Sequence, residues 1–162
     1  LALRRAQAAD FDGLWPLHRA LYLNLRPRVV SEAARELSDY NGFERILTDD
    51  LRGMLEDRDT LVLLAERGRT PVGYITARCQ VEQRRTLPRR ACIEDWYVEE
   101  ALRGQGLGQA LYDALEDTLR AADVQVLECT TWATHQDARR RYAALGFLET
   151  QLTLRKRLQR RP

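Results

Sequence analysis

Apolar residues recur along this chain with two different periods, and these periods predict its helices and strands. Steps of three and four positions after Asp10 favour a helix with one apolar face, in which Pro16 favours a kink or a start near Gly13. Short apolar runs bounded by Gly and Pro favour strands instead. The predicted strands cover residues 1–6, 60–66, 72–81, 91–98, 124–132, 147–150 and 152–158, and two later helices cover residues 111–119 and 136–145.

The connections between these elements predict how the strands pair. The turn at residues 67–71 contains Gly68 and Pro71, which predicts an antiparallel hairpin between the strands that it joins. The strand–helix–strand order from residue 91 to residue 132 predicts a parallel pair with a right-handed crossover. We therefore expect one α/β (α+β) domain over residues 1–162, with a mixed, mostly antiparallel central sheet flanked by helices.

Composition and charge limit the kinds of partner and ligand that we expect for this protein. The net charge of +2 gives no reason to expect binding to nucleic acid, and no apolar run approaches the roughly 20 residues of a membrane span. Cys79, Cys92 and Cys129 are odd in number and widely spaced, which predicts reduced thiols in a cytoplasmic protein. With only His18 and His135 besides, the sequence shows no zinc-ligand spacing, so no metal is expected.

The stretch with the most specific chemistry is the glycine-rich run Arg103-Gly-Gln-Gly-Leu-Gly-Gln-Ala110, between a predicted strand and a predicted helix. Such a turn leaves the first helical N–H groups free, which suits a phosphate or pyrophosphate. A dinucleotide fingerprint is excluded because Gln109 occupies the place of the third glycine. A P-loop is excluded because the only lysine of the chain is Lys156.

This run resembles the acyl-CoA pyrophosphate loop of the GNAT superfamily of N-acetyltransferases, Arg/Gln-x-x-Gly-x-Gly/Ala, and the order of elements is similar to that of the family. The likeness is strongest over residues 92–147 and weak before Thr60. It implies a sheet splayed at the acyl-CoA-binding strand, acetyl-CoA as acyl donor, and a possible homodimer through the last strands. The implied cofactor-binding residues are Trp96, Tyr97, Val98, Arg103, Gly104, Gln105, Gly106, Leu107, Gly108, Gln109 and His135, although the family often has Asn in place of His135.

Two carboxylates and one phenol are the candidate catalytic groups. Glu94 and Asp95 precede the end of the cofactor strand, and strand alternation puts them on opposite faces unless a bulge intervenes. Their surroundings look similar to those in spermidine/spermine and related small-amine acetyltransferases, which implies Glu94 as base and Asp95 as the second candidate. Tyr142 matches the Tyr of the family motif Tyr-x-x-x-Gly-Phe, which implies an acid near the coenzyme sulfur.

These motifs do not identify the molecule that accepts the acetyl group. Residues 31–50 carry a net charge of −4, and a short helix capped by Thr48 or Asp49 is expected to follow. An acidic wall on the acceptor side would favour a small cationic amine, acetylated by direct attack in a ternary complex without a metal or covalent intermediate. The alternatives are a protein or peptide N-acetyltransferase, and a non-catalytic acyl-CoA-binding regulatory module.

Overall fold

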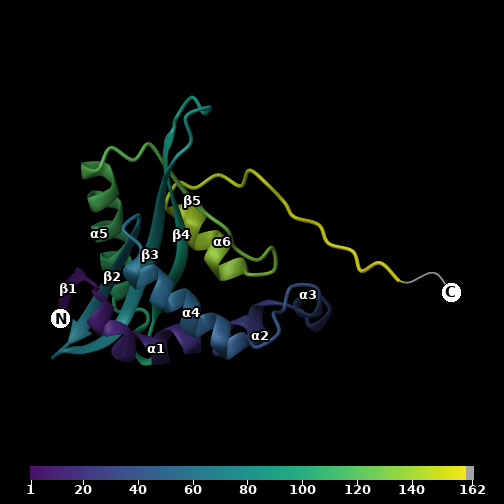
Figure 1. Cartoon of the computed structure of the whole chain (residues 1–162), viewed down its shortest axis with the longest axis horizontal. Helices are drawn as coiled ribbons and strands as arrows, with labels where there is room; N and C mark the ends of the chain where they lie inside the picture. The colour runs from purple at the N-terminus through teal and green to yellow at the C-terminus, as the bar shows by residue number, and fades with distance from the viewer. Residues whose placement is uncertain (160–162) are drawn as a thin grey trace.

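The computed structural model describes residues 1–159 (Figure 1), in which five strands form one sheet. The strands are β1 (Ala2–Arg5), β2 (Thr60–Arg67), β3 (Thr70–Val81), β4 (Arg89–Val98) and β5 (Val126–Cys129). The helices are α1 (Phe11–Ala20), α2 (Arg26–Val29), α3 (Glu32–Glu36), α4 (Phe43–Glu56), α5 (Leu107–Ala121) and α6 (Gln136–Ala144). A π-helical turn, Leu21–Leu25, joins α1 to α2. No helix among residues 1–159 is long and apolar enough to cross a membrane.

The strands lie in the order β1-β2-β3-β4-β5, and only the last pair is parallel. This confirms the predicted mixed, mostly antiparallel sheet, the hairpin of β2 and β3, and the parallel pair around α5. The pairing of β4 with β5 stops at Ile93 and Cys129, although β4 continues to Val98. The sheet is therefore splayed along the second half of β4.

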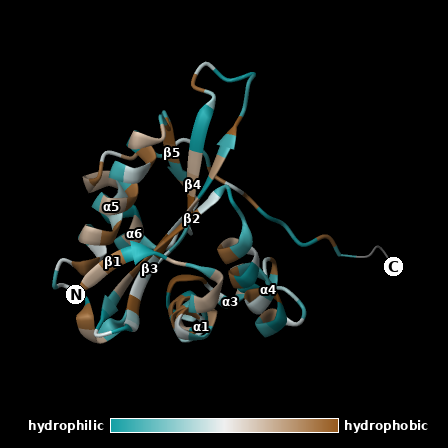
Figure 2. Ribbon diagram, turned by 60° about the vertical axis from the view of Figure 1, so that its left-hand side comes forward, coloured by the Kyte–Doolittle hydropathy of each residue, from teal (hydrophilic) through white to brown (hydrophobic). Residues whose placement is uncertain are grey.

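Helices cover both faces of the sheet, so each strand contributes to two cores (Figure 2). Ile75 and Ile93 point to the α5 face, where they join Leu111 and Leu115 of that helix. Tyr74, the neighbour of Ile75, points to the opposite face and packs with residues of α1 and α4. This alternation follows from the period of two in a strand, and it puts different side chains of β3 and β4 on each side of the sheet.

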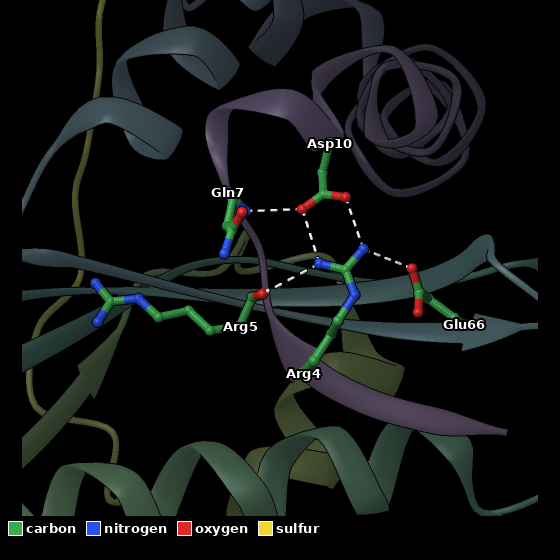
Figure 3. Close-up of polar contacts among 5 residues, drawn as sticks. All are labelled: Arg4, Arg5, Gln7, Asp10 and Glu66. Carbon is green, nitrogen blue, oxygen red and sulfur yellow. Dashed lines mark hydrogen bonds and ion pairs between the residues drawn. The ribbon is translucent and has the colours of Figure 1, made fainter.

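Charged side chains near the N-terminus form a hydrogen-bonded cluster between β1 and its neighbours (Figure 3). Arg4 donates to both carboxylate oxygens of Asp10, at 2.8 and 2.7 Å, and to Glu66 at 2.6 Å. The backbone N–H of Gln7 donates to the same Asp10 carboxylate at 2.8 Å. These bonds tie β1, the turn before α1 and the end of β2 together, and they lower the pKa of Asp10 below its ordinary value.

Two helix predictions need correction. The helix α1 runs without interruption from Phe11 through Pro16, because the proline removes only one backbone donor in a helix that packs on the sheet. The short helix expected after Thr48 is the second part of the longer α4, which begins at Phe43. Thr48 therefore caps nothing, and its hydroxyl donates back to the Glu44 carbonyl at 2.9 Å.

The two predicted closing strands are absent. Phe147 still packs on the core, but residues 148–159 follow an extended path that does not pair with β5 (Figure 1). A strand needs a neighbour that accepts its backbone hydrogen bonds, and alternating side chains alone do not supply one. The residues that would face a core in such a strand are exposed, namely Leu148, Leu152, Leu154 and Leu158, at 70–86%.

Candidate active site

The loop before α5 has the backbone geometry of an anion site. Gly104 and Gly106 have φ angles of +76° and +81°, a region that L side chains rarely adopt. Gly106 is the N-cap of α5, and the first hydrogen bond within the helix runs from the Ala110 N–H to the Gly106 carbonyl at 2.9 Å. The N–H groups of residues 107–109 therefore have no acceptor within the helix and lie at the positive end of its dipole.

Two arginines flank this loop, Arg103 at its start and Arg141 beside the helix end. The Nε of Arg103 donates to the Val98 carbonyl at 3.0 Å. Arg141 of α6 lies over the Trp96 ring, 4.8 Å from its centroid, and its terminal nitrogens would be 3.7 Å from a Cβ placed on Gly108. The first turn of α5 contains no acidic residue. The two arginine side chains and the N-terminus of α5 are all positive and repel one another. A pyrophosphate would be attracted by all three, so this arrangement fits such a ligand.

The second half of β4 exposes backbone to the splayed gap. The Glu99 N–H donates to the Val72 carbonyl of β3 at 3.0 Å, so the Val98 N–H points the opposite way, toward the side that β5 leaves open. Trp96 packs between Tyr112 and Tyr142, with ring centroids 5.6 and 5.9 Å away. The unpaired edge can therefore accept an extended ligand as an added strand.

A β-bulge decides where the two carboxylates point. Ile75 of β3 pairs with Trp96 and Ala77 pairs with Ile93, so two residues of β4, Glu94 and Asp95, oppose Thr76 alone. Such a bulge shifts the alternation by one residue and turns both side chains to the same face. Both carboxylates thus lie on the α1 and α4 side, an outcome that regular alternation would have forbidden.

Asp95 is the buried member of the pair, only 3% exposed. Tyr22 donates its hydroxyl hydrogen to Asp95 at 2.8 Å. The Nδ1 of His18, which is fully buried, lies 2.9 Å from the Tyr74 hydroxyl and 3.4 Å from the other Asp95 oxygen. The steps of three and four positions after Asp10 predict His18 and Tyr22 only as members of the apolar helix face. Their spacing of four residues indicates that both side chains lie on one face of a helix, but nothing in the sequence shows that this face contacts Asp95.

Glu94 is the accessible member, with a side chain that is 29% exposed. Partial burial raises the pKa of its carboxyl, and the nearby charge of Asp95 acts in the same direction, while Arg78 at 2.9 Å opposes the shift. A carboxylate with a raised pKa is a better proton acceptor near neutral pH.

Tyr142 reaches the splayed gap from the other face of the sheet. Its hydroxyl neighbours the Cys129 thiol at the end of β5, and its ring packs edge-on against Phe147 at 5.1 Å. Burial raises the pKa of the Tyr142 phenol far above its ordinary value, so the hydroxyl stays protonated and can donate. His135 is the N-cap residue of α6, but its side chain makes no capping bond.

Comparisons with known proteins agree with this geometry. The model of the acetyltransferase (GNAT) family matches residues 25–147. The search among curated proteins finds no match. An aminoglycoside 6'-N-acetyltransferase from Acinetobacter haemolyticus is 17% identical, with a TM-score of 0.73 over 98% of this chain and 99% of its own.

Two further solved structures have the same fold. The ribosomal-protein-alanine N-acetyltransferase of Brucella melitensis is 18% identical, with a TM-score of 0.69 over 98% of this chain and 100% of its own. AAC(6')-Iy, solved in complex with a CoA bisubstrate analogue, is 16% identical, with a TM-score of 0.69 over 98% of this chain and 97% of its own.

Proposed function

The chain belongs to the GNAT family of acetyltransferases and is an acyl-CoA-dependent N-acetyltransferase, and we propose that its acceptor is the primary amine of a small cationic molecule. The observation that carries this proposal is the bulge of β4, because it turns Glu94 and Asp95 to one face. Burial first, and then the negative charges of Asp95, Asp50 and Glu94, raise the pKa of Tyr22. Asp95 contacts this phenol, and the negative charges of Asp50 and Glu94 act on it from nearby, so the combined field favours a cation there.

Cofactor binding is assigned to the loop and to β4. Acetyl-CoA, when bound, supplies the acetyl group as a thioester. The N–H groups of residues 105–109, with Arg103 and Arg141, are suited to hold the pyrophosphate. The free edge of β4 is suited to bind the pantetheine arm, with the Val98 N–H directed at the thioester carbonyl.

Glu94 is the proposed base. It takes a proton from the acceptor ammonium, directly or through water, so that the amine attacks in a ternary complex. Asp95 is the weaker candidate because it is buried and already accepts the Tyr22 hydroxyl hydrogen. Tyr142 is the proposed acid, which donates its hydroxyl proton toward the departing thiolate.

The acidic stretch at residues 31–50 contributes less to this preference than its charge count suggests. Four of its six carboxylates are in ion pairs with arginines, namely Glu36 with Arg157, Asp39 with Arg26, Glu44 with Arg19, and Asp49 with Arg45. These pairs neutralise most of the excess charge. The attraction for a cation therefore rests on Asp50 and Asp95, and on the part of the Glu94 charge that Arg78 leaves uncompensated.

We also propose a homodimer that uses the C-terminal segment. The segment is extended and exposes its four leucines, while β5 pairs on one side only, with β4. An unpaired strand edge and an unpaired apolar segment of the same chain can satisfy each other between two copies. We further propose that the protein is a single catalytic domain of the cytoplasm, and the free thiols of its three cysteines support the reducing compartment.

The test is thiol release from acetyl-CoA across a panel of polyamines, aminoglycosides, diamino acids and lysine peptides. Acceleration by small cationic amines is expected. Acceleration by lysine peptides alone would replace this proposal with a peptide N-acetyltransferase. Tight binding of the cofactor without acceleration by any amine would contradict the proposed acceptor class and favour a regulatory module.

A further inference from the structure

Arg26, on the acceptor side of the sheet, carries hydrogen-bonding capacity that the protein does not use. Its side chain is only 12% exposed, and its Nε is buried without a hydrogen-bond partner among the described residues. One terminal nitrogen lies 2.8 Å from Asp39, whose own side chain is 51% exposed. Buried guanidinium groups normally satisfy their N–H donors, so an unsatisfied one indicates a missing acceptor.

Two aromatic rings, together with Asp39, hold this guanidinium in place. Its central carbon lies 5.5 Å from the centroid of the Phe43 ring and 5.5 Å from that of Trp132. Rings that contact a guanidinium do not use its N–H edge, and here Asp39 occupies only one terminal nitrogen of that edge. The group that fits such an edge is a carboxylate.

The position of Arg26 relates it to the proposed reaction centre. Tyr22, which donates to Asp95, precedes Arg26 by four residues in a continuous helical segment, so the two side chains emerge on neighbouring parts of one face. Both contact Phe43, since the Tyr22 and Phe43 ring centroids are 6.0 Å apart. The π-helical turn between them is a rare element that often accompanies functional sites.

We propose that Arg26 binds a carboxylate of the acceptor, so that the substrate is a diamino acid acetylated on its distal amine. This rests on the proposed function and narrows its acceptor class. One helical turn separates Arg26 from Tyr22, about 6 Å along the axis. A chain of about four methylene groups covers such a distance, which places the reacting amine near Glu94 while the carboxylate lies on Arg26.

The test compares L-lysine with cadaverine, which differ by the carboxylate alone. Wild-type kcat/KM for lysine is expected to exceed that for cadaverine by about tenfold or more, as for a charge-assisted hydrogen bond. Arg26→Gln should remove this preference by raising the KM for lysine, while the rate with cadaverine and the KM for acetyl-CoA stay within about twofold. Arg28→Gln is the matched control, because that neighbouring side chain is 59% exposed and faces Glu100.

A second variant separates recognition from a purely structural role. If Arg26 only joined α2 to α4 and the segment after β5, Asp39→Asn would weaken both amines and lower the melting temperature as Arg26→Gln does. If Arg26 binds the acceptor, Asp39→Asn frees its charge and the KM for lysine falls or stays unchanged. Equal losses for lysine and cadaverine in Arg26→Gln would overturn the proposal.

Binding without turnover gives an independent measurement. Binding is followed by the fluorescence of Trp132, which contacts Arg26. The dissociation constant for lysine is expected to be lower than that for cadaverine, and the signal is expected to be lost in Trp132→Phe. Wild-type protein that binds or acetylates cadaverine as well as lysine would refute the carboxylate site, even with the acetyltransferase activity intact. Absence of acetyl transfer to every amine would instead refute the proposed acceptor class.

Discussion

Substitution of Gly106 by Asp separates cofactor binding from folding. The residue is the N-cap of α5, its φ is +81°, and a Cβ there would meet nothing within 4 Å. The only folding cost is therefore the left-handed backbone, about 1 kcal/mol. A negative charge at the helix N-terminus offsets about 0.5 kcal/mol of that cost. The free energy of unfolding without ligand should thus change by less than about 1 kcal/mol.

The effect on the cofactor is larger because the new carboxylate faces the pyrophosphate. At about 5 Å and an effective dielectric constant of about 20, each pair of like charges repels by about 3 kcal/mol. Solvent screening at this exposed loop reduces each term to about half. Two phosphate charges then cost about 3 kcal/mol in total, which weakens binding by about 100-fold.

The assay is titration calorimetry with coenzyme A, paired with urea unfolding of the free protein. Gly106→Ala supplies the backbone strain without the charge and should lose much less affinity. Gly68→Asp is the matched control, because Gly68 has a φ of +56° in open space at the turn between β2 and β3. Coenzyme A binding by Gly106→Asp within about threefold of wild type would refute the assignment of this loop to the pyrophosphate.

Four further predictions test the catalytic groups, the fold and the dimer. Glu94→Gln should lower kcat by about 100-fold or more. Since burial raises the pKa of Glu94 above 4.5, kcat/KM of the wild type should increase as the pH rises through that pKa and Glu94 loses its proton. A Glu94→Gln variant that keeps the same rise of kcat/KM with pH would exclude Glu94 as base. Tyr142→Phe should lower kcat while the KM for acetyl-CoA is unchanged, and full turnover would remove Tyr142 from the chemistry. Asp10→Asn should destabilise the protein by about 1 kcal/mol at pH 7. Because Arg4 lowers the pKa of Asp10 in the folded protein, the stabilisation by the ion pair is fully present above pH 3.8, the pKa of the unfolded state, and is lost as the pH falls through the lower pKa of the folded state. A difference in stability between the two proteins that does not depend on pH would contradict the ion-pair explanation. A chain ending at Phe147 should be monomeric by light scattering, and a persisting dimer would exclude the C-terminal segment as its interface.

Local sequence determined the parts of this protein that depend on neighbours in the chain. The glycines at 104 and 106 permit the left-handed turn, and the helix that follows sets the direction of the free N–H groups, so the backbone geometry of this loop was predictable. The apolar periods likewise predicted β2, β3, β4, α5 and α6 to within a few residues. These features need only backbone preferences and the pattern of burial.

Only the tertiary structure decided which distant groups meet. The bulge that turns Glu94 and Asp95 to one face is a register shift against β3, and a single strand sequence does not contain its partner's register. His18 and Tyr22 reach Asp95 because α1 packs against that face, and Arg26 lies against Phe43 and Trp132; these contacts join residues that are far apart in sequence. The C-terminal segment shows the same limit. Its alternating leucines predict a strand, but a strand forms only where another edge accepts its hydrogen bonds.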